Sequence, residues 1–306
     1  MSIVTRRFII LIGFRPTGYP LSVTELVGLR SLPPAPYYSA MSLDRLRDLV
    51  RAYPSALLGY SGGVDSALLA VVLSQELGRE RMLAAIGRSD SYPEAQRLLA
   101  HDIARRFDVP LLEIATRELE DPRYLANPTN RCFYCKTELW SRLGQVAEER
   151  DLAVICDGTN AGDLGEHRPG RAAGSAAGVR SPLADAGLSK ADIRAAAESL
   201  GLPNWDAPAA PCLSSRIQYG VAVTPTRLKQ VEAAEAYLRG EGVTGDLRVR
   251  HTGTTARIEV DPSLIALVEG RLEAVRRYFA GLGFTAVEVD PRGYRRGSLL
   301  LDRVRQ

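Results

Sequence analysis

The stretch Ala56-Leu-Leu-Gly-Tyr-Ser61-Gly-Gly-Val-Asp-Ser66 decides the fold, because a short apolar run leads directly into a glycine pair and the start of a helix. Two glycines allow a tight turn, and the free N–H groups of a turn that opens a helix form a nest for an anion. The loop is shorter than a Walker loop and lacks its Gly-Lys-Ser/Thr ending. A glycine turn with a serine cap is the plain alternative. The candidate phosphate-binding residues are Ser61, Gly62, Gly63, Asp65 and Ser66.

Outward from this stretch, the sequence alternates short apolar runs with segments of helical periodicity. Strands are predicted at residues 56–60, 82–86, 111–115 and 153–156, and helices at 65–77, 93–107 and 136–150. Strands separated by helices of this length pair in parallel, with right-handed crossovers and helices on both faces. We therefore predict an α/β fold with a doubly wound parallel sheet, in which ligands collect at the carboxyl ends of the strands.

A second, smaller α/β unit is predicted at residues 206–306, after a first domain at 41–205. Thr224 or Thr226 is expected to cap a helix, which precedes strands at 247–250 and 257–260, a long helix at 263–282 and a strand at 286–289. Residues 1–40 contain a weak imitation of a signal peptide and a proline-rich stretch. We expect these residues to be a disordered extension before a natural start at Met41, which opens a helix capped by Ser42.

The composition is that of a globular protein, with 306 residues of which 45% are hydrophobic and 25% charged. No window approaches the ~18 uninterrupted apolar residues of a membrane helix. A net charge of +3 is too small to imply a nucleic-acid or membrane partner. Four cysteines are too few for a disulfide scaffold and indicate a reducing compartment. We expect a cytoplasmic, homo-oligomeric protein with a small-molecule partner.

Three of the four cysteines lie in settings that resemble motifs. Cys132 and Cys135 are separated by two residues at the start of a predicted helix, with Lys136 beside them. Cys212 lies in a loop bounded by prolines, and Arg216 follows four residues later. If a helical turn follows Cys212, Arg216 falls on its face, where a cation lowers the pKa of a thiol and makes the thiolate available.

The residues alone leave several kinds of chemistry open for these three cysteines. Three thiolates with one vacant position suit a 4Fe-4S cluster whose open iron could hold a sulfide. Cys212 could instead donate its own sulfur, with the pair incidental or acting as a persulfide relay. Zinc needs a fourth ligand, and none is obvious because His101 and His251 lie elsewhere along the chain. The fourth cysteine, Cys156, falls on a parallel strand and is expected to be buried packing.

Two further groups of polar residues are candidates for ligand binding. The motif Asp157-Gly-Thr159-Asn follows a predicted strand, so its carboxylate and hydroxyl could meet Mg²⁺ or a nucleotide, although a helix-capping turn is the alternative. Arg248 and Arg250 point to one face of a predicted strand, where they could clamp a phosphate while Glu259 orients them. From the pattern alone, a solvated strand face is the better interpretation of these arginines.

The loop at residues 61–66 resembles the signature of the PP-loop ATP pyrophosphatases, which cleave ATP between the α and β phosphates and adenylate a substrate oxygen. Further motifs make the chain similar to the LarE family of sulfur transferases, from about residue 41 to the C terminus. These motifs are Asn130-Arg-Cys-Phe-Tyr-Cys-Lys136, Asp157-Gly-Thr-Asn160, Arg168-Pro-Gly170, Pro211-Cys-Leu-Ser-Ser-Arg216 and Tyr294-Arg-Arg-Gly-Ser298.

The resemblance implies an activity and a set of cofactors. LarE proteins use ATP and Mg²⁺ to convert pyridinium-3,5-biscarboxylic acid mononucleotide into the thiocarboxylate precursor of the nickel-pincer cofactor of lactate racemase. Family members with a cysteine only at the position of Cys212 give up its sulfur and are left with dehydroalanine. Members that also carry the Cys132 and Cys135 pair resemble 4Fe-4S enzymes that turn over repeatedly. This sequence has the second pattern.

The resemblance also implies roles for individual residues. It places Ser89 near the adenine or ribose, and Lys136 is a further candidate for ATP binding. The stretch at 167–180, which includes Arg168 and Arg171, is expected to be a mobile loop that closes over the nucleotide. The expected substrate-phosphate residues are Arg248, Arg250 and Glu259, with Arg295, Arg296 and Ser298 as a second group.

A tRNA thiolase is the main alternative function, because such enzymes share the loop, a Cys-x-x-Cys pair and a third cysteine. The near-neutral charge and the lack of an RNA-binding module argue against it. An ammonia-dependent amidating synthetase would leave the three cysteines without a role, as would a nucleotide sensor without catalysis.

Overall fold

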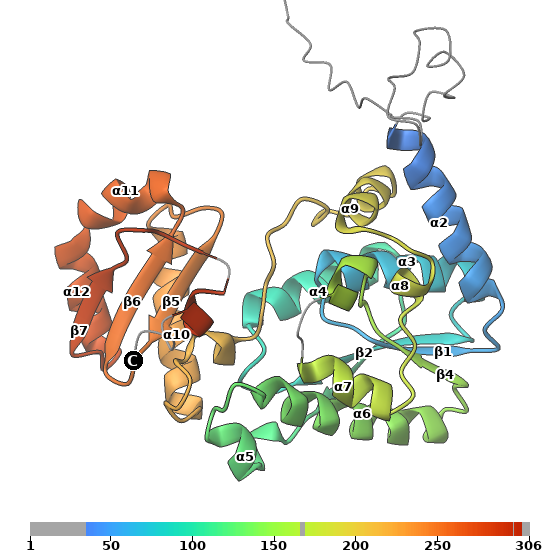
Figure 1. Cartoon of the computed structure of the whole chain (residues 1–306), viewed down its shortest axis with the longest axis horizontal. Coiled ribbons are helices and arrows are strands. Elements are labelled where there is room, and N and C mark those ends of the chain that lie inside the picture. The colour runs from blue at the N-terminus through green and yellow to red at the C-terminus, as the bar shows by residue number, and fades with distance from the viewer. Residues whose placement is uncertain (1–34, 166–168, 296, 302–306) are drawn as a thin grey trace, which may run out of the picture. The chain divides into compact units, whose positions relative to one another are not determined.

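The computed structural model describes residues 35–165, 169–295 and 297–301 (Figure 1). Most of the expected extension at residues 1–40, together with Arg168 and Arg296, lies outside the described residues. The chain divides into two compact units, residues 1–38 and 39–306. The prediction that the first helix begins at Met41 was wrong, because α2 spans Ala35–Arg51. Pro36 lies in the first turn of this helix. The backbone N–H groups of a first turn have no acceptor within the helix, so the N–H that proline lacks is not needed there.

A four-stranded parallel sheet forms the centre of the larger unit. Its strands pair in the order β3-β2-β1-β4, and Leu57 on β1 lies in register with Leu83 on β2 and with Ile155 on β4. The strands are β1 (Ala56–Gly59), β2 (Met82–Arg88), β3 (Leu111–Ala115) and β4 (Val154–Cys156). The α/β class with a parallel sheet is therefore confirmed.

Helices cover both faces of this sheet (Figure 1). On one face, α3, α4 and α9 pack on a core that contains Leu68, Ile86 and Ile103. On the other face, Trp140 and Leu143 of α6 pack against Leu57. The helices are α3 (Val64–Leu77), α4 (Glu94–Arg106), α6 (Arg131–Glu149), α7 (Pro169–Ala176) and α9 (Lys190–Ser199). The doubly wound arrangement follows, because β1 is buried on both sides and needs helices above and below.

The strand order places two loops at the centre of the carboxyl edge. The chain leaves β1 toward β2 and β3 on one side and returns to β4 on the other. The loops after β1 and β4 therefore lie next to each other, at the position where such sheets bind ligands. Short helical segments occupy the remaining connections: η1 (Glu118–Glu120), α5 (Pro122–Leu125), η2 (Ala161–Gly165), α8 (Pro182–Asp185), η3 (Leu213–Arg216) and α13 (Ser298–Leu301).

A second, mixed sheet follows in the C-terminal third. Strand β5 pairs antiparallel with β6, and β6 pairs parallel with β7. Its elements are α10 (Pro225–Gly240), β5 (Leu247–His251), β6 (Thr255–Val260), η4 (Pro262–Leu264), α11 (Ile265–Glu269), α12 (Leu272–Gly281) and β7 (Ala286–Val289). The single helix predicted at 263–282 was wrong. Gly270 lies between α11 and α12, and a glycine inside a helix costs about 1 kcal/mol relative to alanine.

The expected mobile loop at 167–180 is also corrected where the chain is described. Helix α7 begins at Pro169 and continues through a run of alanines, which are strong helix formers. Arg171 donates from this helix to the backbone carbonyls of Asp163 and Leu164. The described residues include no helix that is both long enough and apolar enough to span a bilayer.

Candidate active site

The loop after β1 forms a tight turn that only glycine permits. Gly62 has a φ of +67°, and a Cβ there would lie 2.7 Å from the Cβ of Ala100. Ser66 Oγ accepts from the Ser61 N–H at 3.2 Å and donates to the Gly63 carbonyl at 3.0 Å. Gly63 is the N-cap of α3 and offers no side-chain cap, so the N–H groups of the first turn are left for an anion.

The loop after β4 approaches this turn closely. A Cβ on Gly158 would lie 3.0 Å from the Ser66 nitrogen, so the approach requires glycine. Asn160 Nδ2 donates to Asp65 Oδ1 at 3.4 Å. Asp157 accepts from the Thr159 N–H at 3.0 Å and from the Thr159 hydroxyl at 2.8 Å. The second loop thus orients Asp65, whereas Asp157 and Thr159 stabilise their own turn and their contact with a nucleotide stays a prediction.

Asp65 meets a cation that the sequence did not indicate. Lys190, the first residue of α9, places its Nζ 2.5 Å from Asp65 Oδ2. Asn204 holds the same loop from another segment, because its Nδ2 donates to the Gly62 carbonyl at 2.9 Å. The Oδ1 atom of Asn204 is buried and has no hydrogen-bond partner among the described residues.

Ser89 lies just beyond β2, and its hydroxyl is bonded to a buried carboxylate. Ser89 Oγ donates to Glu118 Oε1 at 2.5 Å, and Ser91 Oγ donates to the same atom at 3.0 Å. Glu118 is 3% exposed, and its Oε2 has no hydrogen-bond partner within the described part of the chain. The hydroxyl hydrogen of Ser89 is thus already bonded to Glu118. The predicted contact with adenine or ribose therefore requires that the nucleotide either takes the place of Glu118 or donates to the Ser89 oxygen.

The three motif cysteines influence one another electrostatically. Helix α6 begins at Arg131, earlier than predicted, so Cys132 and Cys135 lie in its first two turns. Desolvation raises the pKa of Cys135 to about 12, with Glu118 and Cys212 adding to the effect. Desolvation and then Cys212 also raise the pKa of Cys132, although this side chain is partly open to solvent. Cys156 is fully buried on β4, as expected.

Arg131 supplies a buried positive charge to these cysteines. It is 3% exposed and donates to the Asn127 side chain. Desolvation opposes its charge, but the nearby Cys212 and Cys132 outweigh this effect and raise the pKa of Arg131. Lys136 lies over the ring of Trp140, at 5.2 Å from the centroid. The charge of Arg131 works to lower the pKa of Cys132, although desolvation and Cys212 raise this pKa more.

Arg216 forms hydrogen bonds with the backbone around Cys212. The turn after Cys212 is the 3₁₀ helix η3, in which residues three apart share a face, so the expected four-residue alignment with Cys212 does not form. Arg216 Nε instead pairs with Glu235 at 2.9 Å, and Nη1 donates to the carbonyls of Pro211 and Cys212. Its described contacts therefore fix the position of Cys212.

Cys132, Cys135 and Cys212 are the residues that would hold an iron–sulfur cluster, which stays a prediction. Within the described ranges, no three Cys, His, Asp or Glu side chains are close enough to hold one ion together. A 4Fe-4S cluster takes each thiolate on a different iron, so its ligands need not converge on one point. Three thiols that share one electrostatic neighbourhood with a buried arginine have the donor chemistry that such a cluster requires.

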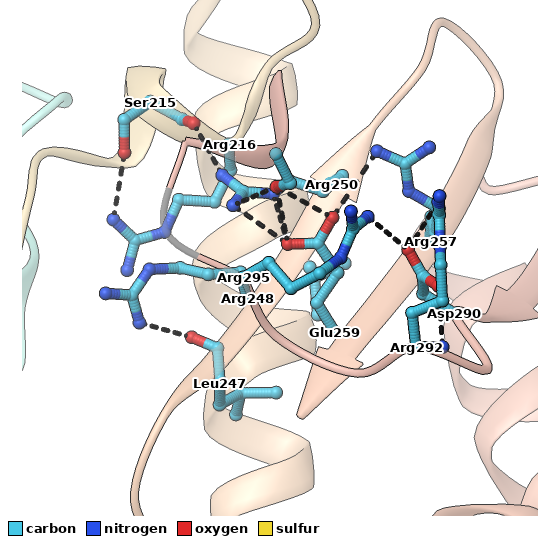
Figure 2. A network of polar contacts seen from close by, with 12 residues as sticks. Ser215, Arg216, Leu247, Arg248, Arg250, Arg257, Glu259, Asp290, Arg292 and Arg295 are labelled. Carbon is cyan, nitrogen blue, oxygen red and sulfur yellow. Dashed lines mark hydrogen bonds and ion pairs between the residues drawn. The ribbon is translucent and has the colours of Figure 1, made fainter. Parts of the chain in front are cut away.

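Arg250 belongs to a buried network on the second sheet (Figure 2). Its Nε donates to Glu259 Oε2 at 2.9 Å, Nη1 to the Ser215 carbonyl at 2.9 Å, and Nη2 to Ser298 Oγ at 3.0 Å. Ser298 Oγ also reaches Glu259 at 3.0 Å. Arg250 is 6% exposed and Glu259 is 0% exposed, so these residues do not form a solvated strand face.

Arg248 has a different set of partners, although it shares the strand face with Arg250 (Figure 2). Its Nη2 donates to the Ala209 carbonyl at 2.8 Å, and its guanidinium lies 5.0 Å from the ring centroid of Tyr294. Burial lowers the pKa of Arg248, and no carboxylate pairs with it among the described residues. Arg295 lies 3.5 Å from Asp290.

Comparison with known proteins identifies the family. A protein of Lactiplantibacillus plantarum named pyridinium-3,5-bisthiocarboxylic acid mononucleotide synthase is 34% identical over 254 residues, which cover 83% of this chain and 90% of that protein. The chain belongs to the LarE family. An uncharacterized protein of Synechocystis is 38% identical, covering 84% of this chain and 96% of its own length. No family model matches the chain.

A third relative, an uncharacterized protein of Methanocaldococcus jannaschii, is 29% identical and covers 78% of this chain and 90% of its own length. The predicted LarE residues fall into three groups: the two loops at the sheet edge, the cysteines, and the arginine network. A hydrogen bond of 2.8 Å from the Leu213 N–H to the Ser91 carbonyl joins the Cys212 segment to the loop after β2. Tyr92 of the same loop donates its hydroxyl to the Ser61 carbonyl at 3.0 Å, so the loop after β2 connects the first group with the second.

Several polar residues beside the candidate site residues were not predicted from the sequence. Lys190, Asn204 and Glu118 lie outside every motif that we recognised. The sequence does contain a signal that places Lys190 at a helix start. Ser189 and Asp192 form a capping box, in which each side chain bonds the other's backbone N–H, so α9 begins at Lys190. Glu118 carries no local signal, since its partners come from 27 and 29 residues away.

Proposed function

We propose that this LarE family member is an ATP-dependent sulfur transferase that acts on pyridinium-3,5-biscarboxylic acid mononucleotide. The observation that carries the proposal is the identity of 34% over 83% of the chain with a relative named for the bisthiocarboxylate product. The glycine turn, the three cysteines and the buried arginines supply groups suited to ATP, sulfur and phosphate respectively.

The first step in this proposal is adenylation. The N–H groups of the loop at 61–66 hold the phosphates of ATP. Asp65 is the side chain that would hold Mg²⁺, which binds proteins through one or two carboxylates together with substrate phosphates. A substrate carboxylate oxygen attacks the α-phosphorus, the bond to the bridging oxygen breaks, and its electron pair leaves with pyrophosphate. The resulting acyl adenylate has a good leaving group, which a free carboxylate lacks.

The second step replaces oxygen with sulfur. A sulfur nucleophile attacks the acyl carbon, the carbon–sulfur bond forms, and AMP departs with the electron pair of the broken carbon–oxygen bond. If Cys212 itself attacks, loss of its α-proton then breaks its Cβ–S bond, which releases thiocarboxylate and leaves dehydroalanine. Cys132, Cys135 and Cys212 would alternatively hold a 4Fe-4S cluster, which supplies a renewable sulfide. We favour the cluster, because the chain has both the pair and the third cysteine.

The substrate is oriented by its own phosphate in this proposal. Arg248 is a buried cation on the second sheet whose described hydrogen-bond partners are neutral, so a phosphate gains a charged hydrogen bond there. Arg250, which pairs with Glu259, donates to the Ser215 carbonyl and thereby fixes the segment that follows Cys212. Two rounds of reaction give the bisthiocarboxylate, which we assign to nickel-pincer cofactor synthesis for lactate racemase. A homo-oligomeric state and a cytoplasmic location remain our expectations.

One assay separates this proposal from the alternatives. Pyrophosphate release from ATP is measured with purified protein in the presence of the pyridinium dicarboxylate mononucleotide, of tRNA, or of ammonia with a carboxylic acid. Stimulation by the mononucleotide, together with thiocarboxylate in the product, supports the sulfur transferase. Stimulation by tRNA alone would instead support a tRNA thiolase, whose loop and three cysteines are similar.

A further inference from the structure

We propose that Lys190 is an additional ATP ligand, which moves from Asp65 to the β- and γ-phosphates when the nucleotide binds. The inference rests on the proposed function in one respect, namely that ATP occupies the loop at 61–66. It adds a residue that lies outside the family motifs described above, on an element far from the loop in sequence.

Lys190 contacts the loop across a long sequence separation. Its Nζ lies 2.5 Å from Asp65 Oδ2, and the two residues are 125 positions apart. The side chains of Lys190 and Asp65 are 47% and 25% exposed. An ion pair this open to solvent contributes little to folding, with typical values of about 0–1 kcal/mol. Its position beside the anion nest therefore suggests a role in binding.

The backbone under Lys190 is rigid, so the side chain alone needs to move. Ser189 caps α9 and forms a capping box with Asp192. Ile193 and Ala197 of α9 are buried in the same core as α3, the helix that the loop opens. A lysine on a fixed base reaches several nearby positions through its flexible four-carbon stem, and its ammonium has three donors.

The charges around the loop require such a cation. The loop itself contributes neutral N–H groups, hydroxyls and one carboxylate, that of Asp65, which repels a triphosphate. Within the described part of the chain, Lys190 is the cationic side chain that pairs with this loop. When Asp65 turns to Mg²⁺, its hold on Lys190 weakens, and the ammonium is left beside the phosphates.

The location of Asp65 points to the pyrophosphate end of ATP. Asp65 would hold a metal ion that neutralises charge on the phosphates of the leaving group, so a cation beside this carboxylate lies near the same charge. As the bond between the α-phosphorus and the bridging oxygen breaks, negative charge develops on the departing pyrophosphate. Lys190 stabilises this charge, and no proton has to be transferred in the step.

The first test compares nucleotides with and without the β- and γ-phosphates. We expect Lys190→Met to weaken ATP binding about tenfold, the effect of one lost charged hydrogen bond, and to change AMP binding less than about twofold. Lys190→Arg keeps most of the affinity for ATP, and Arg276→Met, at an exposed cation of α12, is the control. Titration calorimetry gives the dissociation constants, and thermal unfolding checks the fold.

The second test asks whether Lys190 acts only through Asp65. In an Asp65→Asn background, Lys190→Met should still weaken ATP binding about tenfold, because the lysine contacts phosphate itself. No further effect in this background, or an equal loss of ATP and AMP binding in the single variant, would overturn the inference. If the wild-type protein binds no ATP, the proposed function is refuted. If the wild type and Lys190→Met bind ATP equally, only the role of Lys190 is refuted.

Discussion

The loop at 61–66 and the buried arginine network differ in how far apart their interacting residues lie. The turn of the loop itself closes through hydrogen bonds between residues no more than five positions apart, and distant side chains such as Asn204 add to it. Arg250, in contrast, bonds residues that are 9, 35 and 48 positions away. A turn of consecutive residues can be predicted from its sequence, whereas a network assembled from four segments can be recognised only when the fold brings the segments together.

The network also shows that identical residues on one strand face can do different work. Arg250 is neutralised by Glu259, and its other donors hold Ser215 and Ser298. Arg248 donates to the neutral carbonyls of Leu247 and Ala209. We infer that Arg250 mainly stabilises the segment around Cys212, and that the charge of Arg248 is available to bind an anionic ligand. Five predictions test this contrast between local and long-range construction.

The largest effect is expected at Cys212, on the segment that the arginines hold. Cys212→Ala should reduce thiocarboxylate formation to background, because both proposed sulfur routes use this sulfur. A cluster predicts a brown protein under anaerobic purification that loses its colour in Cys132→Ala and Cys135→Ala as well. A sacrificial route predicts a colourless protein, a single turnover, and dehydroalanine at position 212 in peptide mass spectra. Cys156→Ala is the control, and full activity of Cys212→Ala would refute both routes.

A substitution in the loop at 61–66 should abolish activity and leave the stability of the fold nearly unchanged. Asp65→Ala should abolish AMP formation, because this carboxylate would meet the metal and the phosphates, while the unfolding temperature stays close to that of the wild type. Asp65 is partly exposed and pairs with an exposed lysine, so its removal costs the fold little. AMP release is followed by chromatography, and Asp185→Ala on α8 is the control. Near-normal adenylation by Asp65→Ala would show that the loop does not bind the nucleotide.

The long-range network should show the opposite behaviour. Arg250→Ala removes the shorter ion pair of the buried Glu259, at 2.8 Å, and leaves the one with Arg257 at 3.4 Å. We therefore expect the free energy of unfolding to fall by about 3 kcal/mol, the lower end of the range for a broken buried pair. Denaturant titration measures this change. Arg276→Ala, which removes a surface ion pair with Glu273, should change the same quantity by less than about 1 kcal/mol. Equal effects of the two substitutions would mean that the network does not stabilise the fold.

This contrast also explains how much the sequence could predict. The parallel strands, the loop at 61–66 and the Thr224 cap follow from neighbouring residues, and the structure has them within a few positions of the prediction. The turn after Cys212 is held by a distant residue, because Arg216 pairs with Glu235, and its 3₁₀ geometry was missed. The break at Gly270 has a local cause, the poor helix propensity of glycine, which the prediction of one long helix overlooked. The pairing of Lys190 with Asp65 and of Ser89 with Glu118 likewise required the fold, because no spacing in the sequence relates these residues.

Arg248 should affect substrate binding more than it affects ATP. Arg248→Ala removes a charged hydrogen bond to the substrate phosphate, which should weaken binding of the pyridinium mononucleotide by about 1.5–3 kcal/mol. Titration calorimetry with each ligand provides the comparison. Arg239→Ala is the matched control, because Arg239 also donates to backbone carbonyls, those of Val243 and Gly245. Equal losses for both ligands would assign Arg248 to the nucleotide or to the fold.

The smallest effect concerns the pH dependence of stability at His251, at the end of the strand that carries both arginines. Its Nδ1 accepts from the Gly253 N–H at 3.3 Å, and its Nε2 bonds Gln230 Oε1 at 2.9 Å. This pattern requires the neutral ring, since a protonated Nδ1 cannot accept. Desolvation, and then the charge of Arg227, lower the pKa of His251 from 6.5 to about 4.

The sign of the effect follows from these contacts. Between pH 6.5 and about 4 the unfolded chain binds a proton at His251 that the folded protein excludes, so stability falls as the pH falls through this window. We expect this histidine to contribute a loss of about 1 kcal/mol between pH 7 and pH 5.5. Denaturant titrations at both pH values measure the loss in the wild type and in His251→Gln, which cannot titrate. If the two proteins lose the same free energy over this interval, His251 is not buried in its neutral form.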